Sequence, residues 1–258
     1  MPNTRPGITF NDEGVCIACQ NHERKKEVDW GKRFSELKEL CDKYRRKNPE
    51  DYDCIIAVSG GKDSHYQVYV MKELMNMNPL LITVEDFFTP TYAGTHNQRN
   101  INEAFGCNLV AFKPNRRAGK IISRYMFEKY GRPLWYIDRL LYTVPLYYAA
   151  KLNIPLLVYG ENVSYEYGGI DDEETYSARN QVFNGVAPDV DLDELVNAGV
   201  KREELAYLRA PSQELLDSLE PIYLSYFVEW NGIKNYEYAK KFGFKDLEHE
   251  WDRTNHIE

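Results

Sequence analysis

Long apolar stretches are absent from this sequence of 258 residues. No run of 18 apolar residues occurs, so the sequence offers no candidate for a membrane-spanning helix. The first residues, Met-Pro-Asn-Thr-Arg-Pro-Gly, are not followed by the apolar segment of a secretory leader. Cysteine is also scarce, and five cysteines with a single close pair are unlike a disulfide framework. We therefore expect a protein of the reducing cytoplasm that does not associate with membranes.

Basic residues are outnumbered by acidic ones. The 32 Lys and Arg against 40 Asp and Glu give a net charge of −8, which disfavours a broad basic face. Nucleic acid is therefore not expected as the principal partner. Internal repeats and low-complexity tracts are also missing. Since 43% of the residues are hydrophobic, the chain can bury one large core with at most a small appendage.

The most informative stretch is residues 53–64, where a short apolar run passes through a glycine turn into a helical pattern. The apolar run at 54–58 is typical of a strand that is buried on both faces of a parallel sheet. Gly60 and Gly61 lack Cβ atoms, so the backbone can turn sharply and approach a phosphate. Amide groups at the start of the following helix would then point at the phosphate oxygens. Further along this helix, Val68, Met71, Leu74 and Met75 are expected to share one core-facing side.

Side chains around this turn add groups that suit an anion. Lys62 brings a positive charge, Ser59 and Ser64 bring hydroxyl donors, and Asp63 could hold Mg²⁺ or orient Lys62. The motif is not a Walker loop, which has four residues between its first glycine and a Gly-Lys-Ser/Thr ending. We interpret it as a phosphate-binding loop. The alternative is a tight turn whose glycines serve only packing.

Strands and helices alternate along the rest of the chain. Further apolar runs predict strands at 79–84, 109–112, 154–159 and 222–228, with helical patterns between them. Such alternation indicates right-handed crossovers and a parallel sheet. We expect an α/β fold with an open, mainly parallel five-stranded sheet, helices on both faces and a small N-terminal appendage. The segment 162–182 has little apolar periodicity and is either a mobile lid or an acidic surface connection.

The appendage carries the close pair of cysteines. Cys16 and Cys19 form a CxxC motif, which can supply half of a tetrahedral zinc site. No second pair is near, and Cys41 and Cys54 fall on predicted core positions. The remaining ligands would have to be histidines, with His22, His249 and His256 as the candidates. A zinc site and two packed thiols in a loop both stay open.

The stretch Ser-Gly-Gly-Lys-Asp-Ser at 59–64 resembles the PP-loop of the N-type ATP pyrophosphatases, which split ATP into AMP and pyrophosphate. Other stretches resemble one branch of that group, the N-acetyl sugar amidotransferases of bacterial surface-polysaccharide biosynthesis. This branch makes acetamidino sugars for lipopolysaccharide O-antigen and for pseudaminic or legionaminic acid. The stretches are residues 14–19, 28–30, 53–64, 154–162, 223–227 and 244–251. The loop alone specifies the superfamily, whereas the joint order of the stretches specifies the branch.

The resemblance implies an ATP-dependent amidotransferase that converts the N-acetyl group of a nucleotide-linked sugar to an acetamidino group. An adenylylated intermediate and ammonia would carry the reaction, with Mg²⁺ required and a glutaminase and a cyclase-like subunit supplying the ammonia. Ser59, Gly60, Gly61, Lys62, Asp63 and Ser64 would bind the pyrophosphate. Adenine is expected near Val84, with Gly160 permitting close approach. Glu161 and Asn162 would join Lys62 and Asp63 in catalysis, or they cap the next element.

The resemblance also implies the adenine nucleotide α-hydrolase-like, Rossmann-like variant of this fold. We expect residues 1–48 to hold the CxxC segment and a leading helix, 49–230 the PP-loop domain, and 231–258 a C-terminal helical segment. Chains of the branch usually continue past the equivalent of Trp251. Either this sequence is a fragment, or it lacks part of the substrate or metal site.

Two other functions stay open. A PP-loop tRNA thiolation enzyme would need catalytic cysteines and a positive surface, and here Cys107 stands alone in a chain of negative net charge. A non-catalytic ATP-binding scaffold is the second alternative. The intact Lys62 and Asp63 count against it.

Overall fold

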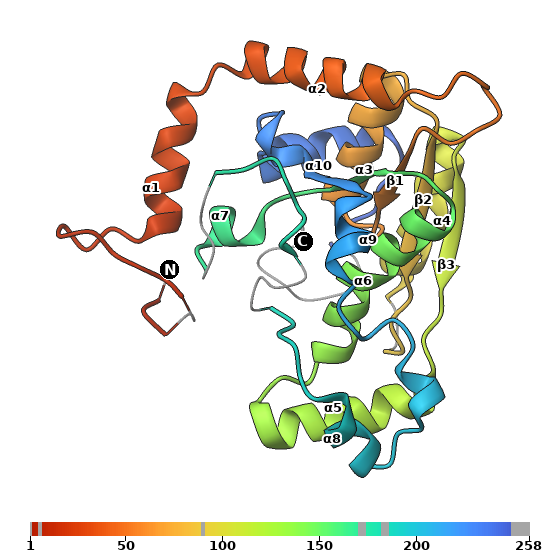
Figure 1. Cartoon of the computed structure of the whole chain (residues 1–258). Helices are drawn as coiled ribbons and strands as arrows, with labels where there is room; N and C mark the ends of the chain where they lie inside the picture. The colour runs from red at the N-terminus through yellow and green to blue at the C-terminus, as the bar shows by residue number, and fades with distance from the viewer. Residues whose placement is uncertain (1, 5–6, 89–90, 170–173, 182–185, 249–258) are drawn as a thin grey trace.

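One open sheet organises the molecule. The structure, a computed structural model, describes residues 2–4, 7–88, 91–169, 174–181 and 186–248. Within these residues five strands form a sheet of order β3-β2-β1-β4-β5, and every neighbouring pair is parallel. Helices cover both faces of the sheet (Figure 1). The prediction of an open, Rossmann-like α/β fold with five parallel strands is therefore confirmed.

The strands coincide largely with the apolar runs of the sequence. Their bounds are β1 Cys54–Ala57, β2 Pro79–Val84, β3 Asn108–Phe112, β4 Leu156–Tyr159 and β5 Glu220–Tyr223. Every residue of β2 and β4 is buried. This is the expected pattern for parallel strands that are covered on both faces.

The predicted fifth strand at 222–228 is wrong in its bounds. Strand β5 begins two residues earlier and ends at Tyr223, after which Leu224–Tyr226 form a 3-10 helix. The turn is fixed by the amide of Ser225, which donates to the carbonyl of Gly160 at 3.0 Å. Phe227 and Val228 nevertheless stay buried. An apolar run indicates that its residues are buried. Here the buried residues continue beyond the end of the strand, so the run overestimates the strand's C-terminal bound.

Alternate residues of β1 enter two separate cores. Ile55 packs with α5 (Arg116–Tyr130) and α6 (Trp135–Lys151) on one face of the sheet. Ile56 packs on the other face with residues of α2 (Trp30–Tyr44), α3 (Lys62–Tyr69) and α4 (Tyr92–Phe105). Successive side chains of a strand point to opposite faces, so one apolar run serves both cores. Cys41 and Cys54 lie fully buried in the second core, as predicted.

One face prediction in this second core is wrong. Val68, Met71 and Met75 are buried, but Leu74, predicted to share their face, is 45% exposed. Residues Val70–Leu74 form a π-helical turn at the end of α3. Its wider turn breaks the spacing of 3.6 residues on which the prediction depended.

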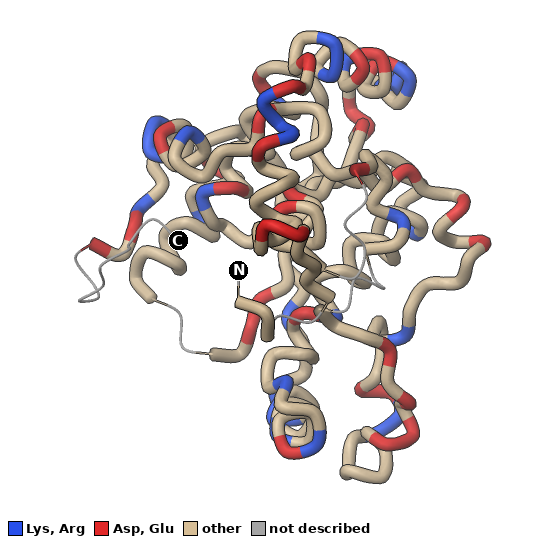
Figure 2. The backbone as a smooth tube through the Cα atoms, turned by 90° about the vertical axis from the view of Figure 1, so that its left-hand side faces the viewer, with Lys and Arg blue, Asp and Glu red and all other residues tan. Residues whose placement is uncertain are grey.

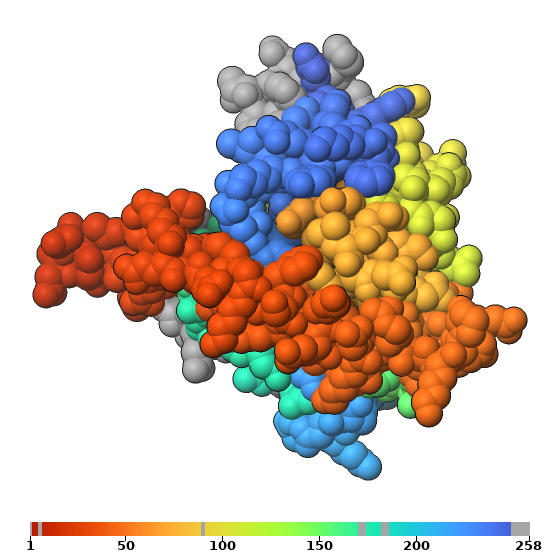
Figure 3. All heavy atoms as spheres, turned by 90° about the horizontal axis from the view of Figure 1, so that it is seen from above, coloured from red at the N-terminus to blue at the C-terminus, as the bar shows by residue number. Residues whose placement is uncertain are grey.

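The N-terminal residues form an arm along one side of the molecule (Figures 1 and 3). The arm contains α1 (Ile17–Arg24), a 3-10 helix at Lys25–Glu27, and then α2. Helix α1 packs against α7 (Val163–Tyr167), the short helix that follows β4. The arm therefore contacts the segment that carries the predicted residues Glu161 and Asn162.

The remaining elements lie at the periphery or near the C-terminus. They are α8 (Leu192–Asn197), a 3-10 helix at Arg202–Leu205, α9 (Gln213–Asp217) and α10 (Gly232–Lys241). Helix α10 packs against α3, although the two are far apart in the sequence. Acidic and basic positions are interspersed along the chain in the view of Figure 2. No helix in the described part of the chain is long and apolar enough to cross a membrane.

Candidate active site

The glycine loop follows β1, the strand at which the order of the strands in the sheet reverses. From β1 the chain proceeds to β2 and β3 on one side, and β4 and β5 are added on the other side. Open α/β sheets bind ligands at such a switch point, beyond the carboxyl ends of the strands. A cavity of about 240 Å³ opens at this place. Predicted site residues that line it are Ser59, Asp63, Ser64, Val84, Gly160 and Glu161.

A second cavity lies on the other side of the same loop. Its volume is about 380 Å³, and Gly60 and Gly61 line it together with the first turn of α4. Ser59 lines both cavities. The loop is therefore a partition between two spaces, and a ligand held by its backbone can extend into either.

Local geometry explains why the loop needs its glycines. Gly60 has φ +84°, and a Cβ atom there would lie 3.1 Å from the backbone nitrogen of Gln98. Gly61 is the N-cap of α3, so no side chain caps the first turn of this helix. The amides of that turn stay available to an anion, and the helix dipole favours negative charge there.

The serine hydroxyls tie the loop to itself. The amide of Ser59 donates to Ser64 Oγ at 2.9 Å, and the two hydroxyl oxygens are 3.2 Å apart. The amide of Gly61 donates to Ser59 Oγ at 3.3 Å. These bonds hold the loop in its turned form without a ligand, so less ordering is needed when a phosphate binds.

Asp63 is held by two neighbours at once. Lys62 Nζ lies 3.0 Å from Asp63 Oδ2, and Asn235 Nδ2 donates to Asp63 Oδ1 at 2.7 Å. Asn235 is fully buried and comes from α10, 172 residues further along the chain. Asn235 could not be predicted from the sequence, because no local pattern connects a residue of the last described helix with the loop.

Glu161 faces the same cavity as Asp63. Burial and, after it, the negative charge of Asp63 raise the pKa of Glu161 to about 7, although the charge of Lys62 opposes the shift. A carboxyl group with a pKa near neutrality can exchange protons at physiological pH. The prediction that Glu161 is at the site agrees with this position.

The two carboxylates suit a divalent cation. Mg²⁺ prefers oxygen ligands, and its charge would relieve the repulsion between Asp63 and Glu161. The residues described here contain no group of three or more His, Cys, Asp or Glu side chains that could hold a metal ion. An ion at this place would therefore complete its shell with phosphate oxygens and water, as Mg²⁺ commonly does in nucleotide sites.

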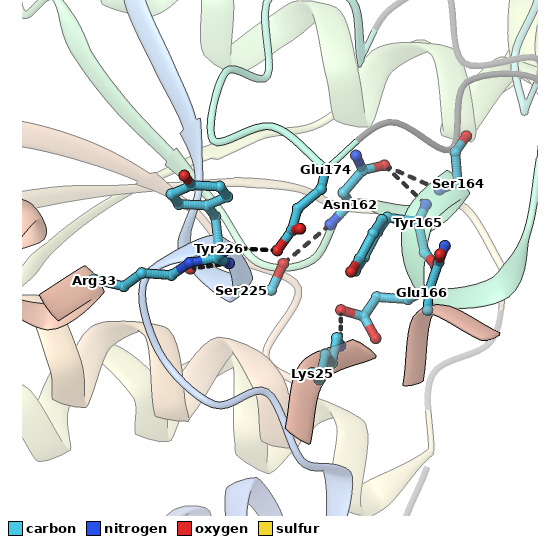
Figure 4. Close-up of polar contacts among 10 residues, drawn as sticks. Lys25, Arg33, Asn162, Ser164, Tyr165, Glu166, Glu174, Ser225 and Tyr226 are labelled. Atoms are coloured by element: carbon cyan, nitrogen blue, oxygen red, sulfur yellow. Dashed lines mark hydrogen bonds and ion pairs between the residues drawn. The ribbon is translucent and has the colours of Figure 1, made fainter. Parts of the chain in front are cut away.

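Asn162 points to the other side of its segment. Its Oδ1 accepts from the amides of Ser164 (3.1 Å) and Tyr165 (3.3 Å), so the side chain is the N-cap of α7. Its own amide donates to Ser225 Oγ at 3.3 Å (Figure 4). Asn162 does not line the cavity of the glycine loop. The capping role that the sequence analysis left open is thus observed, and a catalytic role for Asn162 stays a prediction.

Behind this segment lies a group of paired charges that we name the clamp: Lys25, Arg33, Glu166, Glu174 and Tyr226 (Figure 4). Lys25 pairs with Glu166, and both side chains are largely buried. Arg33 pairs with Glu174, donates to the carbonyl of Tyr226 at 3.0 Å and lies 4.0 Å from the centre of its ring. The clamp joins the N-terminal arm to the residues that follow β4.

The CxxC motif lies on the arm, apart from the loop (Figure 1). Cys16 is the N-cap of α1, and its sulfur is 3.4 Å from that of Cys19. Hydrogen bonds from the backbone and the thiol of Cys19 lower the pKa of Cys16 to about 7. Within the residues that are described, no third metal ligand joins the pair. His249 and His256 lie outside the described residues, so the observed donors do not form a complete zinc site.

Two further polar residues of the cavity were not found from the sequence. Gln67 lies one helical turn after Asp63 on α3, and Gln181 comes from the segment 174–181. A signal for Gln67 exists in retrospect, because residues four apart on a helix share a face. No such rule points to Gln181.

Comparisons with known proteins add the following. No protein-family model matches this sequence. The chain is 24% identical over 146 residues to an uncharacterized protein of Methanocaldococcus jannaschii, a match that covers 54% of this chain and 52% of that protein. The chain thus spans about half the length of the curated relative that it matches.

Solved structures with a similar arrangement include three with low identity. The NH3-dependent NAD synthetase of Campylobacter jejuni subsp. jejuni has a TM-score of 0.42 at 12% identity, covering 87% of this chain and 89% of that one. The NMN synthetase of Francisella tularensis has 0.40 at 12%, covering 83% and 93%. A predicted subunit of tRNA methyltransferase from Methanocaldococcus jannaschii has 0.39 at 16%, covering 72% and 73%. These values are too low to decide function, and the fold rests on the strand order itself.

Proposed function

We propose that this protein is an ATP-dependent enzyme of the PP-loop type that forms AMP and pyrophosphate. One observation supports this most directly. A glycine loop with an uncapped helix start, and with Lys62 and Asp63 in its first turn, lies at the switch point of a parallel sheet beside a cavity that also receives Glu161. A triphosphate needs these groups: amides for its oxygens, a cation for its charge and carboxylates for its metal.

The walls of the cavity support an arrangement of the parts of ATP. Ala57, Val58, Ile82 and Val84 form an apolar wall on the β1–β2 side, which suits the flat adenine ring. The loop amides and Lys62 would hold the phosphates. The second cavity, beyond Gly60 and Gly61, gives the departing pyrophosphate room on the far side of the loop.

Within this class we propose an N-acetyl sugar amidotransferase. It would convert an acetamido group of a nucleotide-linked sugar to an acetamidino group, for lipopolysaccharide O-antigen or nonulosonic acid biosynthesis. Support comes from where the resembling stretches lie. Ser225, from the stretch 223–227, binds the carbonyl of Gly160, from 154–162. Phe244, from 244–251, lines the cavity of Gly60 and Gly61. Stretches far apart in the sequence thus meet around the loop.

The reaction needs activation of the amide, because its oxygen is a poor leaving group. The acetamido oxygen attacks the α-phosphorus of ATP, the bond to pyrophosphate breaks, and a protonated O-adenylyl imidate forms. Ammonia adds to the imidate carbon, the added nitrogen passes one proton to Glu161, and the C–O bond breaks so that AMP departs with the oxygen. A carboxylate with a pKa near 7 suits this proton transfer. Mg²⁺, held by Asp63, would neutralise phosphate charge.

No protein nucleophile is needed in this scheme. The protein aligns oxygen with phosphorus, stabilises the leaving pyrophosphate through Lys62 and the loop amides, and excludes water. Ammonia would come from a glutaminase and a cyclase-like subunit. These partners, like the cytoplasmic location, are part of the proposal.

The state of the thiols argues for this choice over tRNA thiolation. All five cysteines lie in described residues, and none of them lines the cavity. Burial raises the pKa of the Cys41 thiol to about 12, and it also raises the pKa values of the Cys54 and Cys107 thiols. Such thiols are inert as nucleophiles. Cys16 has a lowered pKa, of about 7, but it lies on the N-terminal arm and does not line the cavity.

Mass spectrometry tests the proposal. Nucleotide-linked acetamido sugars, with UDP and CMP carriers, are incubated with the protein, ATP, Mg²⁺ and ammonium. We expect an ATP-dependent product that is lighter by about one mass unit, because oxygen is replaced by NH. AMP should appear in equal amount. ATP consumption that depends on tRNA instead of a sugar would contradict the proposal.

A further inference from the structure

Two buried amides of the cavity have atoms without a hydrogen-bond partner in the described part of the chain. Gln67 is 3% exposed and Gln181 is 5% exposed. Among the residues that the structure describes, Gln67 Nε2 has no acceptor and Gln181 Oε1 has no donor. Both residues line the cavity that Asp63 and Glu161 also line. Buried polar groups are nearly always paired, and leaving one unpaired costs free energy.

A buried asparagine elsewhere shows the usual arrangement. Asn21 donates to the carbonyl of Tyr165 at 3.0 Å and accepts from Arg24 at 3.2 Å. It is 1% exposed, so its burial matches that of the two glutamines. Both ends of this amide are therefore paired within the protein, unlike the two glutamines at the cavity.

The two glutamines come from the β4–β5 side of the site. A Cβ atom on Gly160, at the end of β4, would lie 3.4 Å from Gln67 Cδ. Gln181 follows a segment that is bonded along β5, where the amide of Ala178 donates to the carbonyl of Pro221 at 2.8 Å. The apolar wall of Ile82 and Val84 belongs to β2. Gln67 therefore lies by β4, two strand spacings or roughly 10 Å from β2, and Gln181 lies by β5, three spacings or roughly 14 Å from β2. The amides therefore face a different part of the ligand than the adenine wall does.

We propose that Gln67 and Gln181 bind the acetamido group of the second substrate. An acetamido group has one carbonyl acceptor and one N–H donor, which are the partners that Gln67 Nε2 and Gln181 Oε1 lack. Bound in this way, its oxygen lies beside the glycine loop, where it must meet the α-phosphorus. The identity of the ligand rests on the proposed function. The need for a ligand edge with one donor and one acceptor rests on the two amides alone.

Binding of two sugar nucleotides tests this site. UDP-N-acetylglucosamine and UDP-glucose differ by the acetamido group, so the ratio of their affinities reports recognition of the amide. By calorimetry we expect the wild-type protein to prefer the acetamido form about tenfold. Gln67→Leu and Gln181→Leu should each bring the ratio close to one, while the affinity for ATP stays within about twofold.

Other outcomes overturn the proposal. Equal or undetectable binding of the two sugar nucleotides by the wild type would do so, and so would an unchanged ratio in the variants. A loss of ATP affinity in the variants would instead assign the amides to the adenine edge. A preserved ratio without any pyrophosphate release would contradict the proposed amidotransferase activity but leave the amide site standing.

Thermal unfolding without ligand gives an independent readout. Gln67→Leu and Gln181→Leu remove unpaired polar atoms, so each should raise Tm by about 2–4 °C. Asn21→Leu, the matched control, removes a paired amide and should lower Tm. A fall in Tm for the glutamine variants as large as that of the control would show that their amides are paired within the protein, which overturns the proposal.

Discussion

The two sides of the segment that follows β4 differ in how their polar groups are satisfied. On the cavity side, Glu161 has a raised pKa and the amides of Gln67 and Gln181 lack partners. On the clamp side, Lys25 pairs with Glu166, and Asn162 caps α7 (Figure 4). A few residues thus separate charges that the protein pairs from the amide atoms of Gln67 and Gln181, which lack partners among the described residues. Stability is built on one side and binding capacity on the other, as expected where function and stability compete.

The physical reason is the cost of burial. Burying a charge is unfavourable unless a partner of opposite charge is buried with it. In each ion pair of the clamp, both charged side chains belong to the protein. At the cavity, Lys62 pairs with Asp63, whereas Glu161 keeps a raised pKa, so a proton or an added cation must balance the charge of Glu161. The comparison predicts that substitutions on the cavity side mainly change activity and that those on the clamp side mainly change stability.

The largest effect is expected from Lys62→Ala on the cavity side. Loss of a cation at the transferring phosphates should lower the rate of pyrophosphate release by about 100- to 1000-fold. The free energy of unfolding should change by less than about 1 kcal/mol, because the ion pair of Lys62 in the described structure is with its neighbour in the sequence, Asp63. A pyrophosphate assay and urea unfolding measure the two quantities. Lys234→Ala, at a half-exposed pair with Glu229, is the control. Normal turnover by folded Lys62→Ala would refute the role of the loop.

Lys25→Met tests the prediction that substitutions on the clamp side lower stability. Glu166 would be left buried without its partner, which should lower the free energy of unfolding by about 2–3 kcal/mol. The side chains of this pair are 12% and 14% exposed, so water cannot replace the lost charge. Lys26→Met is the matched control, because its pair with Glu23 is 66% exposed at both partners. The control should change stability by less than about 0.5 kcal/mol. Equal losses in the two variants would mean that the clamp does not stabilise the arm.

Glu161→Gln sharpens the comparison through pH. The folded protein raises the pKa of Glu161 from 4.5 to about 7, so it holds a proton that the unfolded chain releases. The contribution of Glu161 to the free energy of unfolding is complete below pH 4.5. It is lost as the pH rises through 7, by about 3 kcal/mol in total. The variant lacks this loss and should gain stability over the wild type as the pH rises. Urea unfolding between pH 4.5 and 8 measures the difference.

Glu23→Gln serves as the control of opposite sign. Its hydrogen bond and charge interaction with Lys26 lower the pKa of Glu23, so its exposed pair adds stability only above its ordinary pKa. Parallel pH curves for wild type and Glu161→Gln would show that Glu161 is not perturbed. The wild-type rate of ATP-dependent product formation should also rise with pH through 7, because the proposed role needs the ionised carboxylate.

The smallest effect is expected from Asn235, which positions Asp63. Asn235→Leu removes the hydrogen bond to Asp63 Oδ1 and should lower kcat by about tenfold. Asn235→Asp places a second carboxylate beside Asp63, so repulsion between the two charges should change the pH profile of activity. Steady-state rates over pH measure both effects. Glu237→Ala, at an exposed position of the same helix, is the control. An unchanged profile in Asn235→Asp would show that the contact is structural only.

Local rules recovered the loop and most of the sheet. Gly60 and Gly61 indicated a sharp turn, and the structure shows a positive φ at Gly60 and an uncapped helix after Gly61. The apolar run at 79–84 matches β2 without error. Where the same rule failed, as at β5, burial continued into a turn that only the contact with Gly160 explains. The π-helical turn that exposes Leu74 likewise has no signal in a spacing of 3.6 residues.

The sequence by itself determined where most of the strands and the glycine loop lie. Strand burial, glycine turns and helix starts depend on residues within a few positions of one another. Tertiary structure alone decided which groups surround that loop. Asn235 reaches Asp63 across 172 positions, and Lys25 reaches Glu166 across 141. Such contacts follow from how α10 and the N-terminal arm pack on the sheet. That packing balances burial over the whole chain, so no short pattern of residues encodes it.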